Sequence, residues 1–224
     1  MNPAVGPRAA GGPVSGDGDR ALVLDLDGTV YPADGPVTAA IDARTTDFLL
    51  RHTGLGAGEL AALERERPSI LDALDHLGIP RDHWARAVHG GLEYTGLLRP
   101  DPGLRAALAR VRARRVVVTL APATHARSVL AALGLTDLVD DLFSVFDTAD
   151  AYKDRVYAEL AADQGGGARI LVVGDNPRLD LDPAAAHGCG CLLVGRPRGP
   201  QRYPAYATLP DALTSAGFAA WSGH

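Results

Sequence analysis

The chain has 224 residues, of which 46% are hydrophobic and 22% charged, so it can bury a core in one or two domains. Its net charge of −5 and pI near 5.8 argue against a nucleic-acid-binding protein, and no apolar stretch reaches the roughly 20 residues of a transmembrane helix. Residues 1–19 are rich in Gly, Pro and Ala without the apolar region of a signal peptide, so we expect a flexible tail there.

The first predicted strand lies near residues 21–26, and two carboxylates, Asp25 and Asp27, lie at its end, followed at once by a Gly-Thr pair. Charged groups at the end of a buried strand cost folding free energy unless a metal, a ligand or water stabilises them. Asp is also a common turn residue, so capping of the following turn is the alternative explanation for the pair.

Residues 33–96 lack the alternation of strands, and their apolar residues follow helical periods. Breaks at glycine and proline predict four helices, at residues 38–51, 57–65, 69–77 and 81–89. We expect a compact helical insert that acts as a lid over the strand ends and excludes water from the site. A helical domain with only a packing role is the alternative.

After residue 97, strand-like and helical patterns alternate, which predicts βαβ units and a parallel sheet. The expected strands lie near residues 115–120, 142–146, 169–173 and 190–194. The expected helices lie near residues 101–112, 123–133, 153–163, 182–187 and 209–216. The chain is therefore expected to have an α/β fold.

Polar side chains end two of these later strands. One strand ends in Thr119, and another is followed by Asp175 and Asp180. The chain's only lysine, Lys153, begins the helical stretch between them. Ligands of open α/β sheets bind at the carboxyl ends of the strands, so we expect these groups to share one site with the first strand's carboxylates. Several carboxylates, one cation and one hydroxyl suit phosphate together with Mg²⁺, a hard ion that takes oxygen ligands.

The four segments in this order, at Asp25 to Thr29, Thr119, Lys153 and Gly174 to Asp180, resemble the motifs of the haloacid dehalogenase (HAD) superfamily of phosphohydrolases. The resemblance covers roughly residues 20–196. It implies a Rossmann-like, doubly wound core over residues 20–32 and 97–224, with a helical C1 cap of subfamily I over residues 33–96. Within the superfamily the chain looks closest to the pyrimidine 5′-nucleotidase-like branch, on the segments Asp25 to Pro32, Leu97 to Leu108 and His125 to Asp137.

The resemblance also implies catalytic roles. Asp25 would be the nucleophile that forms an aspartyl-phosphate, and Asp27 would be the acid for the leaving group and then the base for water. Substrate binding would fall to the Thr119 hydroxyl, the turn at Leu120 and the Lys153 ammonium. The family often has Asn where this chain has Leu120, which weakens the expected phosphate contacts at that position.

Mg²⁺ is the cofactor that the resemblance implies. Its expected ligands are Asp25, the backbone carbonyl of Asp27, Asp175 and Asp180. Asp182 competes with Asp180 for the role of second acid in the last motif. We prefer Asp180, because Asp182 then lies in the first turn of a helix, where the helix dipole favours an acidic residue.

The implied function is hydrolysis of a small phosphomonoester, with a pyrimidine nucleoside 5′-monophosphate as one candidate. A phosphomutase and a noncatalytic phosphate-binding domain are the alternatives, whereas a dehalogenase is disfavoured because its chemistry needs no metal. The expected partner is a small phosphorylated substrate, without nucleic acid or membrane, and a homodimer is an open alternative. Cys189 and Cys191 are expected to be reduced thiols in a cytoplasmic protein.

Three further side chains are candidates near the site. Trp84 and Tyr94 either stack on a base or sugar of the substrate or belong to the apolar core. His125 lies either near the phosphate or on a helix surface.

Overall fold

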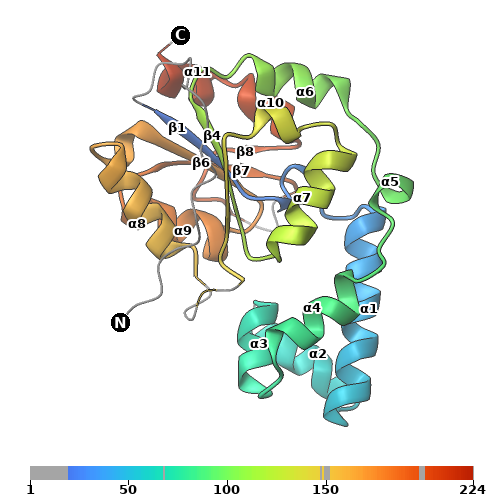
Figure 1. Cartoon of the computed structure of the whole chain (residues 1–224). Helices are drawn as coiled ribbons and strands as arrows, with labels where there is room; N and C mark the ends of the chain where they lie inside the picture. Colours follow the sequence, from blue (N-terminus) through green and yellow to red (C-terminus); the bar gives the residue numbers. More distant parts are fainter. Residues whose placement is uncertain (1–19, 68, 147, 149–151, 197–199, 224) are drawn as a thin grey trace, which may run out of the picture.

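The computed structural model describes residues 20–67, 69–146, 148, 152–196 and 200–223, and the tail expected at residues 1–19 lies outside this part. Six parallel strands form one sheet in the order β5-β4-β1-β6-β7-β8 (Figure 1). Their bounds are Ala21–Leu24 (β1), Arg114–Thr119 (β4), Asp141–Ser144 (β5), Ile170–Gly174 (β6), Gly190–Val194 (β7) and Ala205–Tyr206 (β8). The expected α/β fold with a parallel sheet is confirmed, and β8 is an edge strand that the sequence pattern does not predict.

Helices cover both faces of the sheet, because alternate residues of each strand point to opposite sides. On one face lie α6 (Pro102–Ala109), α7 (Ala123–Ala132), α10 (Leu209–Leu213) and α11 (Ala216–Ser222), packed on a core that includes Leu22 and Leu24. On the other lie α8 (Asp154–Asp163) and α9 (Asp182–Ala186), packed on a core that includes Ala21 and Val23. The sheet is thus doubly wound.

Two of the expected helices differ from the structure by more than two residues. The helix expected over residues 209–216 is two helices, since the Ser215 hydroxyl accepts a hydrogen bond from the Phe218 N–H and so caps a second helix. The helix expected to reach residue 112 ends at Ala109, because the chain turns there and enters β4 at Arg114.

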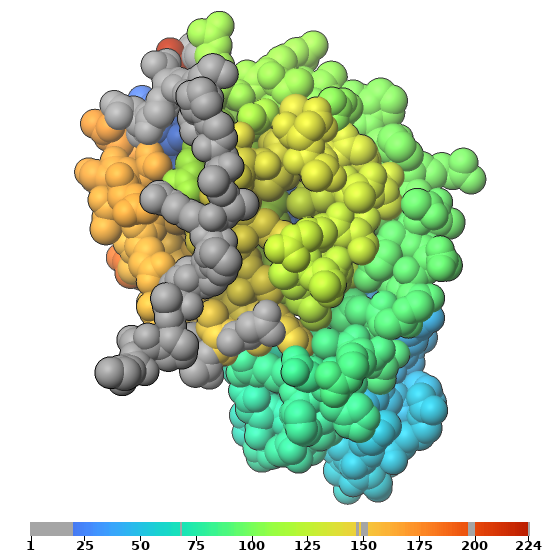
Figure 2. Space-filling model, in the orientation of Figure 1, coloured from blue at the N-terminus to red at the C-terminus, as the bar shows by residue number. Residues whose placement is uncertain are grey.

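Residues 36–89 form a helical lobe of four helices, α1 (Pro36–Thr53), α2 (Ala57–Glu66), α3 (Ile70–His76) and α4 (Arg81–His89). The lobe has an apolar core of its own, formed by residues such as Phe48, Leu74 and Trp84. Gly54 ends α1 with a φ of 70°, a left-handed conformation that favours glycine. Figure 2 shows the lobe, coloured blue to green, as a distinct mass beside the α/β core.

The lobe contacts the carboxyl edge of the sheet. Leu120, directly after β4, and Phe146, shortly after β5, pack against the lobe's apolar core. Arg81 Nη1 donates hydrogen bonds to the carbonyls of Phe146 and Thr148, at 3.0 and 2.7 Å. The short helix α5 (Tyr94–Leu97) leads from the lobe back to the core. Among the helices in the described ranges, none is long and apolar enough to cross a membrane.

Short elements complete the chain. Two-residue strands at Asp27–Gly28 (β2) and Tyr31–Pro32 (β3) pair with each other. Helical turns lie at Thr136–Leu138, Gly167–Arg169 and Pro177–Leu181. The turn at Pro177–Leu181 is a single π-helical turn two residues after β6, and it carries Asp180.

Candidate active site

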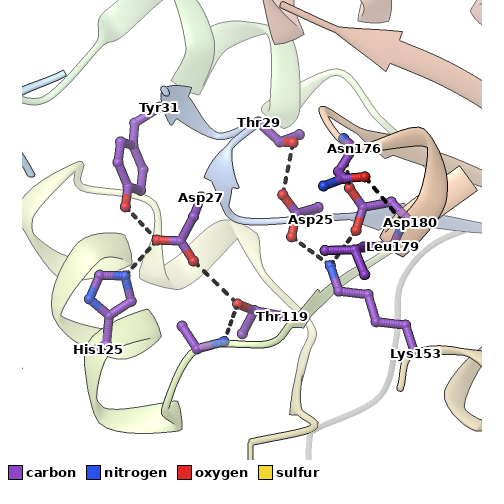
Figure 3. A network of polar contacts seen from close by, with 11 residues as sticks. Asp25, Asp27, Thr29, Tyr31, Thr119, His125, Lys153, Asn176, Leu179 and Asp180 are labelled. Carbon is purple, nitrogen blue, oxygen red and sulfur yellow. Dashed lines mark hydrogen bonds and ion pairs between the residues drawn. The ribbon is translucent and has the colours of Figure 1, made fainter. Parts of the chain in front are cut away.

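The site lies where β1, β4 and β6 end. These three strands are adjacent and in register, with Leu24 opposite both Val117 and Val173. The Asp25 N–H donates to the Val173 carbonyl at 2.9 Å, so the chain stays attached to the sheet for one residue beyond β1. The strand ends therefore bring the predicted side chains to one edge, where Figure 3 shows two neighbouring groups.

The first group surrounds Lys153. Its Nζ lies 2.6 Å from Asp25 Oδ1 and 2.8 Å from Asp180 Oδ1, and its side chain is only 1% exposed. Thr29 Oγ1 donates to the other oxygen of Asp25 at 3.0 Å, so both oxygens of that carboxylate are held (Figure 3). Burial lowers the pKa of Lys153, but Asp180 and Asp25 outweigh it and raise this pKa well above its usual value. Lys153 is therefore a buried cation locked between two carboxylates.

Asp175 adds a third carboxylate beside this lysine. One oxygen from each of Asp25, Asp175 and Asp180 lies within 4.8 Å of the others. Burial, and then the negative charge of Asp180, raise the pKa of Asp25 well above its usual value and that of Asp175 to about 7. Three carboxylates facing one ammonium leave negative charge unbalanced, and all three donors are oxygens. The group therefore fits a hard divalent cation such as Mg²⁺.

Gly28 makes room for this group. Its φ is 86°, in the left-handed region, and a Cβ at this position would lie 2.2 Å from Asp175 Oδ2. Glycine at position 28 thus permits the turn after β1 and also leaves space for the Asp175 side chain, which follows β6.

The second group surrounds Asp27. Its Oδ1 accepts hydrogen bonds from the Tyr31 hydroxyl and from His125 Nε2, the latter at 2.8 Å (Figure 3). Its Oδ2 lies 3.4 Å from Thr119 Oγ1, which also accepts a bond from the Ala121 N–H at 3.0 Å. Burial raises the pKa of Asp27, but the hydrogen bonds from His125 and Tyr31 outweigh it, so the pKa lies below its usual value.

The structure brings most of the predicted site residues together. Asp25, Lys153, Asp175 and Asp180 form the first group, and Asp27 and Thr119 form part of the second. Two others lie elsewhere. Leu120 packs against the helical lobe. Asp182 accepts a hydrogen bond from the Tyr203 hydroxyl at 2.6 Å and lies 3.5 Å from Arg202 Nη1.

The sequence does not predict all contacts of Asp27. The sequence does not predict Tyr31 as a site residue, and it places His125 either near the phosphate or on a helix surface, whereas the structure buries the His125 side chain fully against Asp27. A signal was present for His125, because it lies in the first turn of α7, the helix that leaves the carboxyl end of β4. The Tyr94 hydroxyl lies within hydrogen-bonding distance of His125 Nδ1, while Trp84 is a core residue of the lobe.

A family model for haloacid dehalogenase-like hydrolases matches residues 20–188. None of the curated proteins matches the chain significantly. A HAD phosphatase from Thermococcus onnurineus has a similar fold, with 20% identity, a TM-score of 0.56, and coverage of 85% of this chain and 94% of that one. A putative beta-phosphoglucomutase from Thermotoga maritima is also similar, with 17% identity and a TM-score of 0.57. The match covers 87% of this chain and 96% of that one.

A third similar structure is a 2-haloacid dehalogenase from Pseudomonas syringae, with 17% identity, a TM-score of 0.54, and coverage of 90% of this chain and 99% of that one. Such low identities establish a shared fold, and the three structures are named for three different activities. The family match, in contrast, spans most of the chain and includes the strand ends described above. The chain therefore belongs to the haloacid dehalogenase-like hydrolase family.

Proposed function

We propose that the protein is a Mg²⁺-dependent phosphomonoesterase that acts on a small phosphorylated metabolite through an aspartyl-phosphate on Asp25. One observation carries the proposal. The Asp25 carboxylate is held by Lys153 Nζ at 2.6 Å, while a second carboxylate, Asp27, is held apart from that lysine by Tyr31 and His125. One acid is thus paired with the lysine, and the other, which Tyr31 and His125 hold, is assigned the proton transfers.

Asp25 is placed to act as a nucleophile. Its carboxylate attacks phosphorus, and the bond from phosphorus to the leaving oxygen breaks. Lys153 screens the repulsion between the anionic carboxylate and the anionic phosphate, because its ammonium is already in contact with the attacking group. Thr29 and Lys153 together fix the orientation of the carboxylate, which lowers the entropic cost of attack.

Asp27 handles the proton in both steps. In its protonated form Asp27 gives a proton to the leaving oxygen, and it regains a proton from the water that attacks the aspartyl-phosphate. The second attack releases inorganic phosphate and restores Asp25. Thr119 Oγ1 lies 3.4 Å from Asp27 and can donate to a phosphoryl oxygen between the two acids.

The acidic group of Asp25, Asp175 and Asp180 would hold Mg²⁺, with the Asp27 carbonyl as a further expected ligand. When bound, Mg²⁺ supplies Lewis-acid screening of the phosphoryl charge. Within the proposal the helical lobe acts as the C1 cap of subfamily I, since Leu120 and Phe146 seat it against the edge of the sheet that carries the site.

Release of inorganic phosphate tests the proposal. The panel includes pyrimidine nucleoside 5′-monophosphates, sugar phosphates and small alkyl phosphates, each with Mg²⁺ and with EDTA. Asp25→Asn should abolish release. Asp182→Asn is the matched control, because the same change falls on a carboxylate bound to Tyr203 instead of Lys153. Release that persists in EDTA or in Asp25→Asn would refute the mechanism, and conversion of one phosphate ester into another would indicate a phosphomutase.

A further inference from the structure

A chain of hydrogen bonds runs from Tyr94 to Asp27. The Tyr94 hydroxyl lies 2.8 Å from His125 Nδ1, and His125 Nε2 lies 2.8 Å from Asp27 Oδ1. The members come from separate elements, since Tyr94 belongs to α5, which follows the helical lobe, and His125 belongs to α7 of the core. The imidazole is thus held at both nitrogens.

The position of the His125 ring is tightly determined. Its side chain is fully buried. The ring of His89, the last residue of α4, lies 4.7 Å from the His125 ring, and the Tyr94 ring lies 5.3 Å from it. A buried ring with partners at both nitrogens and aromatic neighbours has little freedom to rotate. His125 can therefore hold the group to which it is bonded in one orientation.

The bonding pattern distinguishes the two oxygens of Asp27. An ionised carboxylate can only accept, so His125 Nε2 carries a hydrogen and donates it to Oδ1. The Tyr31 hydroxyl donates to the same oxygen, which then has two donors. Oδ1 is therefore the oxygen that the neighbouring side chains hold, and Oδ2 is the oxygen with the weaker partner. Within the described ranges, Oδ2 has the Thr119 hydroxyl as its partner at 3.4 Å, where a hydrogen bond is weak.

We propose that Tyr94 and His125 are positioning residues that anchor Asp27 Oδ1 and so leave Oδ2 as the oxygen that exchanges protons with the substrate. The inference rests on the proposed function, in which Asp27 protonates the leaving group. It adds that the two positioning residues come from different parts of the fold, His125 from the core and Tyr94 from the segment that follows the helical lobe. Seating of the lobe then influences the orientation of the acid.

The leaving group supplies the test. An alkoxide needs a proton to depart, whereas 4-nitrophenolate departs without one. Misplacing the acid should therefore lower kcat/KM for an alkyl phosphate and spare 4-nitrophenyl phosphate. We expect His125→Ala to lower kcat/KM for the alkyl phosphate by about 10- to 100-fold, which is part of the usual contribution of general acid catalysis. The loss of kcat/KM for the aryl phosphate should be much smaller. His125→Gln should recover part of the loss, since its amide can donate where Nε2 does.

Two further variants sharpen the readout. Tyr94→Phe removes one hydroxyl and should show the same substrate dependence with a smaller loss. Tyr152→Phe is its matched control, because that hydroxyl donates to Asp72 at 3.2 Å, away from Asp27. In the Asp27→Asn background, His125→Ala should have no additional effect on the alkyl substrate if it acts through Asp27.

The outcomes separate this inference from the proposed function. If a folded His125→Ala variant loses equal amounts of kcat/KM on both substrates while Asp25→Asn is inactive, the proposed positioning role of His125 is wrong. The proposed phosphatase function would still stand. Full activity of Asp25→Asn would instead refute the phosphatase mechanism. Crystal structures then decide the anchor without any assay: rotation of the Asp27 carboxylate in His125→Ala supports it, and an unchanged carboxylate overturns it.

Discussion

Replacing Asp175 by Asn should stabilise the metal-free protein at alkaline pH. Asp175 faces Asp25 and Asp180 in a group where Lys153 is the balancing cation. Burial and the charge of Asp180 raise the pKa of Asp175 from 3.8 to about 7. Ionising this group in the folded protein is therefore costly, and Asn removes the charge while keeping the size of the side chain.

The sign and size follow from linkage between proton binding and folding. A carboxyl group whose pKa is raised by folding contributes stability that is present below pH 4 and is lost as pH rises through about 7. A shift of that size corresponds to about 4 kcal/mol once the group is fully ionised. Between pH 5 and pH 8 the ionisation of Asp175 should lower the free energy of unfolding of the wild type by about 2 to 3 kcal/mol. Asp175→Asn lacks this ionisable group and should not show that loss.

Urea unfolding in EDTA at pH 5 and pH 8 measures the effect. The free energy of unfolding of Asp175→Asn should exceed that of the wild type by a margin that grows with pH. Added Mg²⁺ should stabilise the wild type, by about 2.7 kcal/mol at one hundred times its dissociation constant, and should stabilise the variant much less. A margin that is negative at pH 8, or that does not change with pH, would refute the charge argument.

Three further changes test other parts of the structure. Lys153→Met leaves buried carboxylates without their cation and should lower the free energy of unfolding at pH 7, in urea, by about 3 to 5 kcal/mol. Gly28→Ala should weaken Mg²⁺ binding at least about tenfold by calorimetry, since its Cβ would meet Asp175 Oδ2 at 2.2 Å. Phe146→Ala removes a buried ring from the lobe's apolar core and should lower the free energy of unfolding, measured in urea, by about 3 to 5 kcal/mol.

Each of these has a control or a contradicting result. Gly54→Ala shares the positive φ of Gly28 but its Cβ would meet nothing within 4 Å, so it should leave Mg²⁺ affinity unchanged. Equal weakening in both glycine variants would show backbone strain at work instead of crowding. Unchanged stability of Lys153→Met at pH 7 would mean that protonation of the carboxylates replaces the lysine. A loss below about 1 kcal/mol in Phe146→Ala would mean that the lobe does not need this contact.

Much of the fold follows from local patterns. The apolar runs that end at Asp25, Thr119 and Asp175 predict three strands, and all three are central strands of the sheet. Parallel strands share one carboxyl edge, so predicting the strands also predicts that their terminal side chains are neighbours. Glycine and proline mark the ends of the lobe's helices, so the sequence predicts these helices to within a few residues.

The sequence favours Asp180 over Asp182, and the tertiary structure shows which of the two side chains faces Lys153. The two lie two residues apart, and sequence spacing alone does not tell which side chain faces inward. The π-helical turn after β6 directs Asp180 to Lys153 Nζ at 2.8 Å, and its other oxygen accepts from the Asn176 N–H at 3.0 Å. Asp182 begins α9 and faces Tyr203 instead.

The sequence by itself determined the class of fold, the strand ends and the acids that gather there, because periodicity and turn residues act over short stretches of chain. Only the tertiary structure decided what surrounds Asp27. His125 is 98 positions from Asp27, and Tyr94 is 31 positions from His125. Contacts over such distances depend on how α5 and α7 pack on the sheet, and no local pattern of residues encodes that packing.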